Sequence, residues 1–434
     1  MKLHTINAVL YFTLATAILS MPACKKDYTN PSAVPSTQAF SSPQAMTGVA
    51  IGLQRLYTAG RGSSLYNKIA LDGLLTNQLV VLNQGNTAEY QLQQGSGSVD
   101  GTNTILGGLW TTSNKIIYDA DQILSSAASL GDKNYASGLI GYTTIFKALA
   151  LGDLAMFWQK VPASTGKDVG FADRIEGFNK AIAAIDAALA AINANAISAS
   201  FLSAIPAGID IVNTLNALKA RYSLFVGNYD QALAAANAVD LSVASAFSFT
   251  TVNLNPIFET ATSTNNVYAI MDSAALGLPA GLQPDPGDKR PPFYVTSAYA
   301  SKIAGFAAAA TTPFPIYLPG EMTLIKAEAY ARQTPPDLTS ALAELNKVIT
   351  KTPASDPFGV GAGLPPITGP LTQEEILNQI YKQRSIELFM SGLRLEDMRR
   401  FGRPDTEKKR NFLPYPFLER DNNPNLAGIP DPTF

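Results

Sequence analysis

Apolar residues recur at helical spacing along much of this 434-residue chain, and two stretches carry the pattern in adjacent pairs. In each pair an apolar stripe is broken by a turn and then resumes, which is typical of two amphipathic helices joined by a short connection. The first pair has stripes at Ile211, Leu215, Leu218, Tyr222 and Phe225, then Ala232, Ala236 and Val239; the second has Leu318, Met322, Ile325 and Ala329, then Leu338, Ala341, Leu342, Leu345, Val348 and Ile349.

The two pairs also resemble each other in sequence. Lys219-Ala220 corresponds to Lys326-Ala327, and the pattern Ala-Leu-x-x-x-Asn-x-Val recurs at 232–239 and 341–348. Small alanines at fixed places let two helices approach closely, so a recurring helix-turn-helix unit resembles a tetratricopeptide repeat. The alternative is two unrelated helical hairpins in an alanine-rich chain.

Further helices are expected at 109–130, 138–158 and 179–196. Thr372 and Glu375 form a capping box that opens a helix running to about Arg400, with a possible interruption at Gly392. Residues 60–108 and 241–317 are rich in Gly, Pro, Asn, Ser and Thr, and we interpret them as loops and short strands. The predicted fold is mainly α, with tetratricopeptide-like helix pairs as a scaffold for loop-rich, partly irregular ligand-binding insertions.

The N-terminus carries an apolar run that is too short to span a bilayer. Met1 to His4 contain one lysine, Ala8 to Ser20 contain no charge, and Cys24 follows. A charged start, a short apolar core and small residues before a cut are typical of a secretory signal, whereas a span needs about 20 residues. The cysteine at the cut resembles a bacterial lipoprotein signal, although Met21 and Pro22 depart from the usual box.

This resemblance implies a signal peptide at 1–23, lipidation at Cys24, a tether at 24–45 and a binding domain at 46–434. The alternatives are a plain secretory signal with a stray cysteine, or a short buried helix.

Composition excludes several kinds of site. The chain has one histidine, His4, and one cysteine, Cys24, so after cleavage it could assemble neither a triad based on histidine nor a zinc site of His and Cys. We expect no metal, no cofactor and no catalytic residue. The net charge of −2 offers no general attraction to nucleic acid, and the charged share of 15% is low against about 25% in typical proteins.

A charged motif lies near the C-terminus, with Arg384, Glu387, Leu388, Gly392, Arg394, Asp397 and Arg400. In these positions the chain resembles the SusD/RagB family of surface lipoproteins. Gln383 and Ser391 depart from the family pattern, which usually has Glu at both. Further similar pieces are Gly320 to Ala329, Phe412 to Pro416 with Asn423 to Leu426, Trp110 with Tyr118 and Ala120-Asp121, and Trp158 to Pro162.

The resemblance implies a protein without enzymatic activity that is lipid-anchored at the outer membrane and faces outward. It implies binding of an oligosaccharide, or sometimes a peptide, and delivery to a TonB-dependent SusC-like transporter. The alternatives are a lipid-anchored glycosidase that uses two carboxylates and a helical-repeat scaffold that binds only protein.

Sugar binding needs flat aromatic surfaces with polar groups at their edges. Both tryptophans, Trp110 and Trp158, lie on helical stripes and are assigned to the core, so tyrosines are expected to stack on the ligand. The candidate contacts form two clusters: Asn83, Gln84, Asn86, Glu89 and Tyr90 in the first loop region, and Asp288, Arg290, Phe293, Tyr294 and Tyr299 in the second. Each cluster could also be a solvated loop or a transporter contact.

The charged residues of the last predicted helix have two interpretations. Arg384 with Glu387 and Glu396 with Arg400 are three and four residues apart, so each pair could meet on one helix face. Glu387 with Asp397 is a conceivable catalytic dyad, but nearby arginines lower a carboxylate pKa, and a glycosidase acid needs the reverse. A structural role that ties the last helix to the repeat core or the tail is expected.

Overall fold

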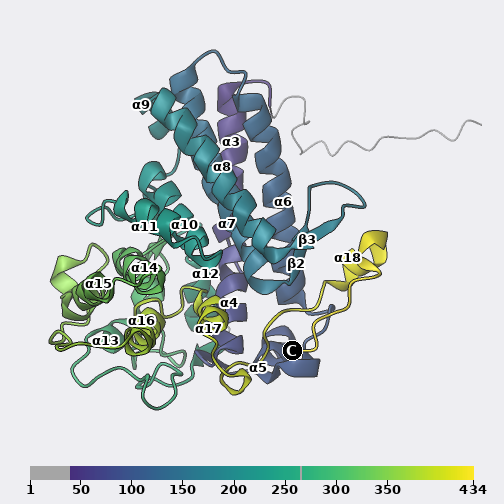
Figure 1. Ribbon diagram of the computed structural model, residues 1–434. Helices are drawn as coiled ribbons and strands as arrows, with labels where there is room; N and C mark the ends of the chain where they lie inside the picture. The colour runs from purple at the N-terminus through teal and green to yellow at the C-terminus, as the bar shows by residue number, and fades with distance from the viewer. Residues whose placement is uncertain (1–39, 264–265) are drawn as a thin grey trace, which may run out of the picture. The chain divides into compact units, whose positions relative to one another are not determined.

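The computed structural model describes residues 40–263 and 266–434 (Figure 1). The described part is mainly helical, which confirms the predicted fold class. Its longer helices are α3 (Pro43–Thr58), α4 (Ser64–Leu75), α5 (Thr87–Gln94), α6 (Thr104–Ala127), α7 (Lys133–Phe157), α8 (Arg174–Ala194), α10 (Ile211–Phe225), α11 (Tyr229–Asn237), α14 (Pro319–Arg332), α15 (Leu338–Thr350), α16 (Gln373–Glu387) and α17 (Arg394–Arg400). The last residues of the expected tether, 43–45, are helical, because α3 begins at Pro43, directly after its N-cap residue Ser42.

Short elements connect these helices. They are the helices α9 (Ala199–Leu202), α12 (Pro256–Phe258), α13 (Arg290–Tyr294) and α18 (Phe417–Asn422), the 3-10 helices at 96–98, 305–307, 353–355, 405–407 and 424–426, and the π-helical turn η2 (Glu259–Ser263). Three antiparallel two-stranded ladders complete the fold: β1 (Leu79–Val81) with β5 (Tyr268–Ile270), β2 (Lys160–Pro162) with β3 (Phe171–Asp173), and β4 (Ala246–Phe247) with β6 (Phe314–Pro315).

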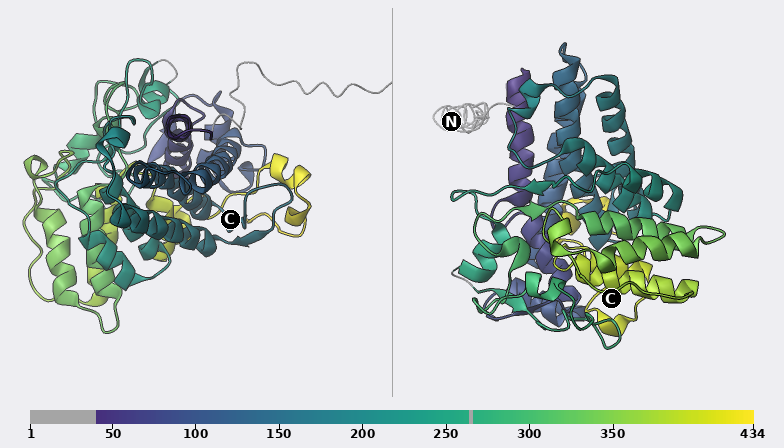
Figure 2. Two further views of the ribbon diagram at one scale, coloured as in Figure 1. Left: turned by 90° about the horizontal axis from the view of Figure 1, so that it is seen from above. Right: turned by 90° about the vertical axis from the view of Figure 1, so that its left-hand side faces the viewer.

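The helix pairs predicted from the repeated pattern are confirmed. Helix α10 packs on α11, α14 packs on α15, and α11 packs on α14, so the two hairpins are consecutive layers of one array, which α16 extends (Figure 2). The matching alanines Ala220 and Ala327, and Ala232 and Ala341, are all fully buried. Small side chains at these contacts allow the close helix approach that a tetratricopeptide-like array requires.

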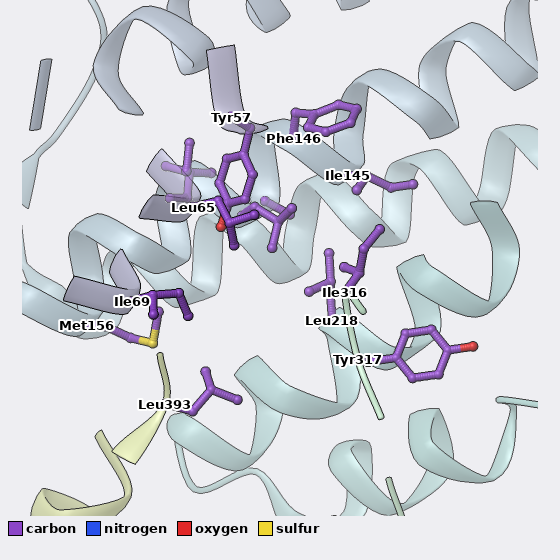
Figure 3. Close-up of a cluster of buried hydrophobic side chains, with 14 of the residues drawn as sticks. Tyr57, Leu65, Ile69, Ile145, Phe146, Met156, Leu218, Ile316, Tyr317 and Leu393 are labelled. Carbon is purple, nitrogen blue, oxygen red and sulfur yellow. The ribbon is translucent and has the colours of Figure 1, made fainter. Parts of the chain in front are cut away.

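A long bundle of α3, α6, α7 and α8 forms the other half of the scaffold (Figure 1). Helix α7 is long and apolar enough to cross a membrane, but 89% of its most apolar window is buried inside the protein, as expected of a core helix. Tyr57 of α3, Phe146 of α7 and Leu218 of α10 belong to one hydrophobic core, which joins this bundle to the repeat array (Figure 3).

The interpretation of residues 60–108 as loops was wrong for three segments. Helix α4 occupies 64–75 with every residue buried, α5 occupies 87–94, and α6 begins at Thr104. A helix that is surrounded by protein needs no polar face, so it shows no amphipathic stripe. Residues 241–317 do consist mostly of loops, short helices and short strands, as predicted.

The C-terminal helix is interrupted where Gly392 suggested. Helix α16 begins with the predicted capping box and ends at Glu387, and α17 begins at Arg394. Gly392 has φ +72°, and a Cβ there would lie 2.7 Å from the Lys68 side chain, so the turn requires glycine for both conformation and space.

The ion pairs predicted within the last helix do not form. Arg384 instead pairs with Asp397 at 2.8 Å across the break, and Arg400 pairs with Asp397 and with Glu328 of α14. The expected structural role is therefore correct, since the charges tie α16, α17 and the repeat array together. Glu396 pairs with Arg174 of α8 at 3.0 Å.

Candidate functional site

The β1–β5 ladder positions the first predicted cluster. Leu82 donates its backbone N–H to the carbonyl of Val267, and the chain then turns through 83–86 into α5. Asn83 Oδ1 accepts from the backbone N–H of Gly85, and Asn86 donates its amide to the Asn83 carbonyl. These local bonds fix an exposed polar loop at the N-terminus of α5.

This loop borders an open pocket of about 530 Å³. The structure brings Asn86 and Glu89 of the predicted cluster into its lining, together with residues far away in sequence. The other polar lining residues are Arg61, Asn67, Thr87 and Thr104. Gly62, Gly85 and Gly108 lie between them, so backbone is accessible at the pocket wall.

Arg61 and Glu89 form the charged centre of the pocket. The Arg61 guanidinium donates to Glu89 Oε1 through Nη2 at 2.6 Å and through Nε at 3.1 Å, and to Asn86 Oδ1 at 3.0 Å. The Arg61 side chain is 42% exposed, whereas that of Glu89 is 1% exposed. The pocket therefore presents a cation whose position is fixed by a buried carboxylate and an amide.

Tyr66 also fixes the position of Glu89, because its hydroxyl donates to Glu89 Oε1 at 2.7 Å. Burial raises the pKa of the Tyr66 hydroxyl strongly, so it remains a neutral donor. Glu89 Oε2 is buried and accepts no hydrogen bond from the described residues.

The remaining members of the first cluster lie beside this pocket rather than in its lining. Asn83 and Gln84 are exposed, and Tyr90 on α5 is half-buried. Arg61, Asn67 and Thr104 were not among the predicted contacts. Arg61 lies between two glycines, Gly60 and Gly62, a flexible setting that gives no motif of its own.

The second predicted cluster separates into a buried part and a surface part. Arg290 is fully buried and Asp288 is 7% exposed. The guanidinium donates to both Asp288 oxygens, at 3.0 and 2.7 Å, to Glu387 at 3.2 Å and to Gln383 at 2.6 Å. Burial and pairing leave these two side chains no surface for a ligand, which corrects their assignment as contacts.

Tyr294 is also a core residue. It is 3% exposed, its hydroxyl donates to the Glu387 carbonyl, and its ring meets Phe293, Phe306 and Phe389. A ring covered in this way cannot stack on a sugar, and truncating it would empty the core. Phe293 is half-buried in the same aromatic cluster.

Tyr299 alone of the second cluster exposes much of its ring, 40%. It makes an edge contact with Phe258, 6.1 Å between ring centroids. Phe258 leads into η2, where the Thr260 carbonyl accepts from the backbone N–H of Val267, and Val267 is also bonded to Leu82. The Tyr299–Phe258 pair and the 83–86 loop are thus attached to the same strand ladder.

Glu387 and Asp397 do not form the conceivable catalytic dyad. Glu387 is fully buried between Arg290 and Lys351, and Asp397 is buried between Arg384 and Arg400. Burial opposes ionisation of Asp397, but the two guanidinium groups outweigh it and hold the pKa of the carboxyl below its usual value. Neither group has access to a substrate, and Asp397 has the reverse of the pKa shift that a general acid needs.

Both tryptophans are core residues, as predicted. Trp158 is fully buried and donates Nε1–H to the Pro414 carbonyl at 2.9 Å, and Trp110 is 2% exposed and donates to Glu419. The two rings meet edge to face, with centroids 4.9 Å apart. Together they fasten the C-terminal tail to α6 and α7. Cys24, the predicted lipidation site, lies outside the described residues.

Comparison with known proteins supports the family resemblance. Residues 294–432 match the model of the SusD family. A SusD superfamily protein from Parabacteroides distasonis has a TM-score of 0.66 at 14% identity, with coverage of 91% of this chain and 98% of that one. No curated protein matches the sequence significantly.

Two of the similar structures are of proteins named for a carbohydrate ligand. A laminarin-binding SusD-like protein has a TM-score of 0.64 at 14% identity, covering 88% of this chain and 97% of that one. A SusD-like carbohydrate-binding protein from Bacteroides fragilis has a TM-score of 0.60 at 14% identity, covering 84% and 87%. The resemblance to SusD/RagB-type proteins is thereby confirmed, and the shared fold extends over nearly the whole chain.

Proposed function

We propose that this SusD-like protein binds an oligosaccharide without chemically changing it, and that the Arg61–Glu89 pocket is part of the binding surface. The observation that carries the proposal is the pocket itself. It combines a fixed, exposed guanidinium with the side-chain amides of Asn67 and Asn86 in the lining. Such planar, fixed donors and acceptors suit the ring of hydroxyl groups on a sugar.

The aromatic component of the site is Tyr299, supported by Phe258, with Tyr90 beside the pocket. An exposed ring offers a flat apolar face to the C–H side of a sugar. The laminarin-binding and carbohydrate-binding proteins among the similar structures favour a glycan over a peptide. Asn83 and Gln84 extend the polar edge of the surface.

The proposed delivery step follows from the same resemblance. The binder would pass its ligand to a TonB-dependent SusC-like transporter while it is held at the outward face of the outer membrane by lipid on Cys24. A transporter that co-purifies from solubilised membranes would support this arrangement. Mass spectrometry that finds an unmodified Cys24 thiol in exported protein would contradict the anchor.

The binding proposal is tested with the purified protein on a glycan array, followed by calorimetry with the retained glycan. Arg61→Ala and Asn86→Ala are expected to weaken binding at least about tenfold, because each removes fixed hydrogen-bonding groups, one of them charged. Tyr299→Ala is expected to weaken it through loss of stacking.

Two variants serve as matched controls. Arg55 is exposed on α3, and Asn422 is exposed on α18; both lie outside the pocket. Arg55→Ala and Asn422→Ala should bind as the native protein does. Unchanged affinity in all three site variants would refute the site, and steady release of shorter glycans would refute a purely binding role.

A further inference from the structure

A second pocket, of about 350 Å³, lies where the end of α4 meets the segment after β5, α16, α17 and the 3-10 helix at 405–407. Its lining shares no residue with the Arg61–Glu89 pocket. Four residues give it an apolar surface: Met271, Leu278, Pro279 and Met398. At its wall the backbone of Gly277 packs closely against the backbone of Asn77, since a Cβ on Gly277 would lie 1.9 Å from the Asn77 carbonyl oxygen.

Arg394 of α17 lines this pocket although it is only 4% exposed. Nη1 donates to the Leu276 carbonyl at 2.9 Å and Nη2 to the Ser385 carbonyl at 2.7 Å. Nε–H has no acceptor among the described residues. The Tyr381 hydroxyl at the same pocket also lacks a well-oriented partner within the described chain, although the Ser385 hydroxyl lies beside it.

The carboxylates around Arg394 are engaged elsewhere. Within the described ranges, none lies within ion-pairing distance of its guanidinium. Asp72 accepts from Leu395 N–H and from Gln78, and Asp397 pairs with Arg384 and Arg400. At the pocket itself Glu407 pairs with Arg403.

Within the described chain the guanidinium is therefore a buried cation that donates only to neutral carbonyl groups, and it lies over the Phe389 ring, 5.9 Å from the centroid. Burial lowers its pKa. A buried charge of this kind is unfavourable until an opposite charge joins it. The remaining carboxylate of the lining, Asp272, accepts from two backbone N–H groups and is exposed at the rim.

We propose that this pocket is a second ligand site, which takes a carboxylate-bearing sugar about the size of one ring. The carboxylate would pair with the guanidinium of Arg394, which lines the pocket together with Tyr381. Asn77, Asp272 and Thr406 would meet the ring hydroxyls at the rim. The volume is near the lower end of small-ligand pockets, which limits the occupant to about one ring.

The test is calorimetric titration of the full protein with glucuronate, glucose, acetate and inorganic phosphate. Glucuronate is expected to bind at least about tenfold more tightly than glucose, because only the acid satisfies the buried cation. Acetate and phosphate separate recognition of a sugar acid from recognition of a simple anion. Arg55→Ala, whose side chain lies outside both pockets, should leave glucuronate binding unchanged.

Two kinds of variant keep the result interpretable. Arg394→Gln removes the charge but also two bonds that support the fold, so its folded state is checked by circular dichroism. Thr406→Trp fills the pocket from an exposed rim position, and Thr251→Trp places the same bulk on a remote exposed loop as its control.

Loss of glucuronate binding in Thr406→Trp but not in Thr251→Trp would support the site. The proposal would be overturned if glucuronate did not bind, or bound no better than glucose, acetate or phosphate. Normal binding of glucuronate to Thr406→Trp would also overturn it.

Discussion

Replacing Arg290 with methionine distinguishes a structural role from a ligand contact. The side chain is fully buried and makes four hydrogen bonds to Asp288, Glu387 and Gln383. Methionine keeps much of the volume but removes the charge, which leaves Asp288 buried without its partner. Glu387 keeps only Lys351, at 2.5 Å.

The expected cost is the value for breaking a buried pair from one side, about 3–5 kcal/mol of unfolding free energy. Urea titration followed by both fluorescence and circular dichroism measures it, with coincident curves as the check on cooperativity. Lys289→Met is the matched control, because Lys289 is the exposed neighbour and should change stability by no more than about 0.5 kcal/mol.

A double variant sharpens the measurement. Adding Glu387→Gln to Arg290→Met removes the second charge, so the combined loss should be smaller than the sum of the two single losses. If Arg290→Met lost less than about 1 kcal/mol yet abolished glycan binding, the structural reasoning would be refuted and the side chain would be a ligand contact.

Two further predictions concern packing and pH. Gly320→Ala should lower the unfolding free energy by about 1–3 kcal/mol, because the new Cβ would lie 1.9 Å from Glu387 Oε1, whereas Gly107→Ala in α6 has open space and should be neutral or stabilising in the same urea titration. Asp397 has a lowered pKa because Arg384 and Arg400 outweigh its desolvation, so its stabilising effect is present above about pH 4 and is lost as the pH falls through the folded-state pKa. The stability difference between native protein and Asp397→Asn should therefore be constant near neutral pH and shrink in acid; a difference that grows in acid would contradict the assignment.

Local features of this protein were predictable from local sequence. The stripes of 211–239 and 318–349 predicted the paired helices, the Thr372–Glu375 box predicted where α16 begins, and the tryptophans were correctly assigned to the core. Each depends on spacing within one or two turns of backbone, which the sequence contains directly.

Only the tertiary structure decided which charged and aromatic side chains face solvent. In the sequence, the segment with Asp288, Arg290 and Tyr294 resembles a polar loop with aromatic residues. In the structure, α16 covers these side chains and supplies Glu387 and Gln383 as their partners. A charge is buried only where a partner from another element meets it, and that pairing depends on long-range packing. The same packing brings Arg61 to Glu89, and it leaves Arg394 beside a pocket without a carboxylate partner in the described chain.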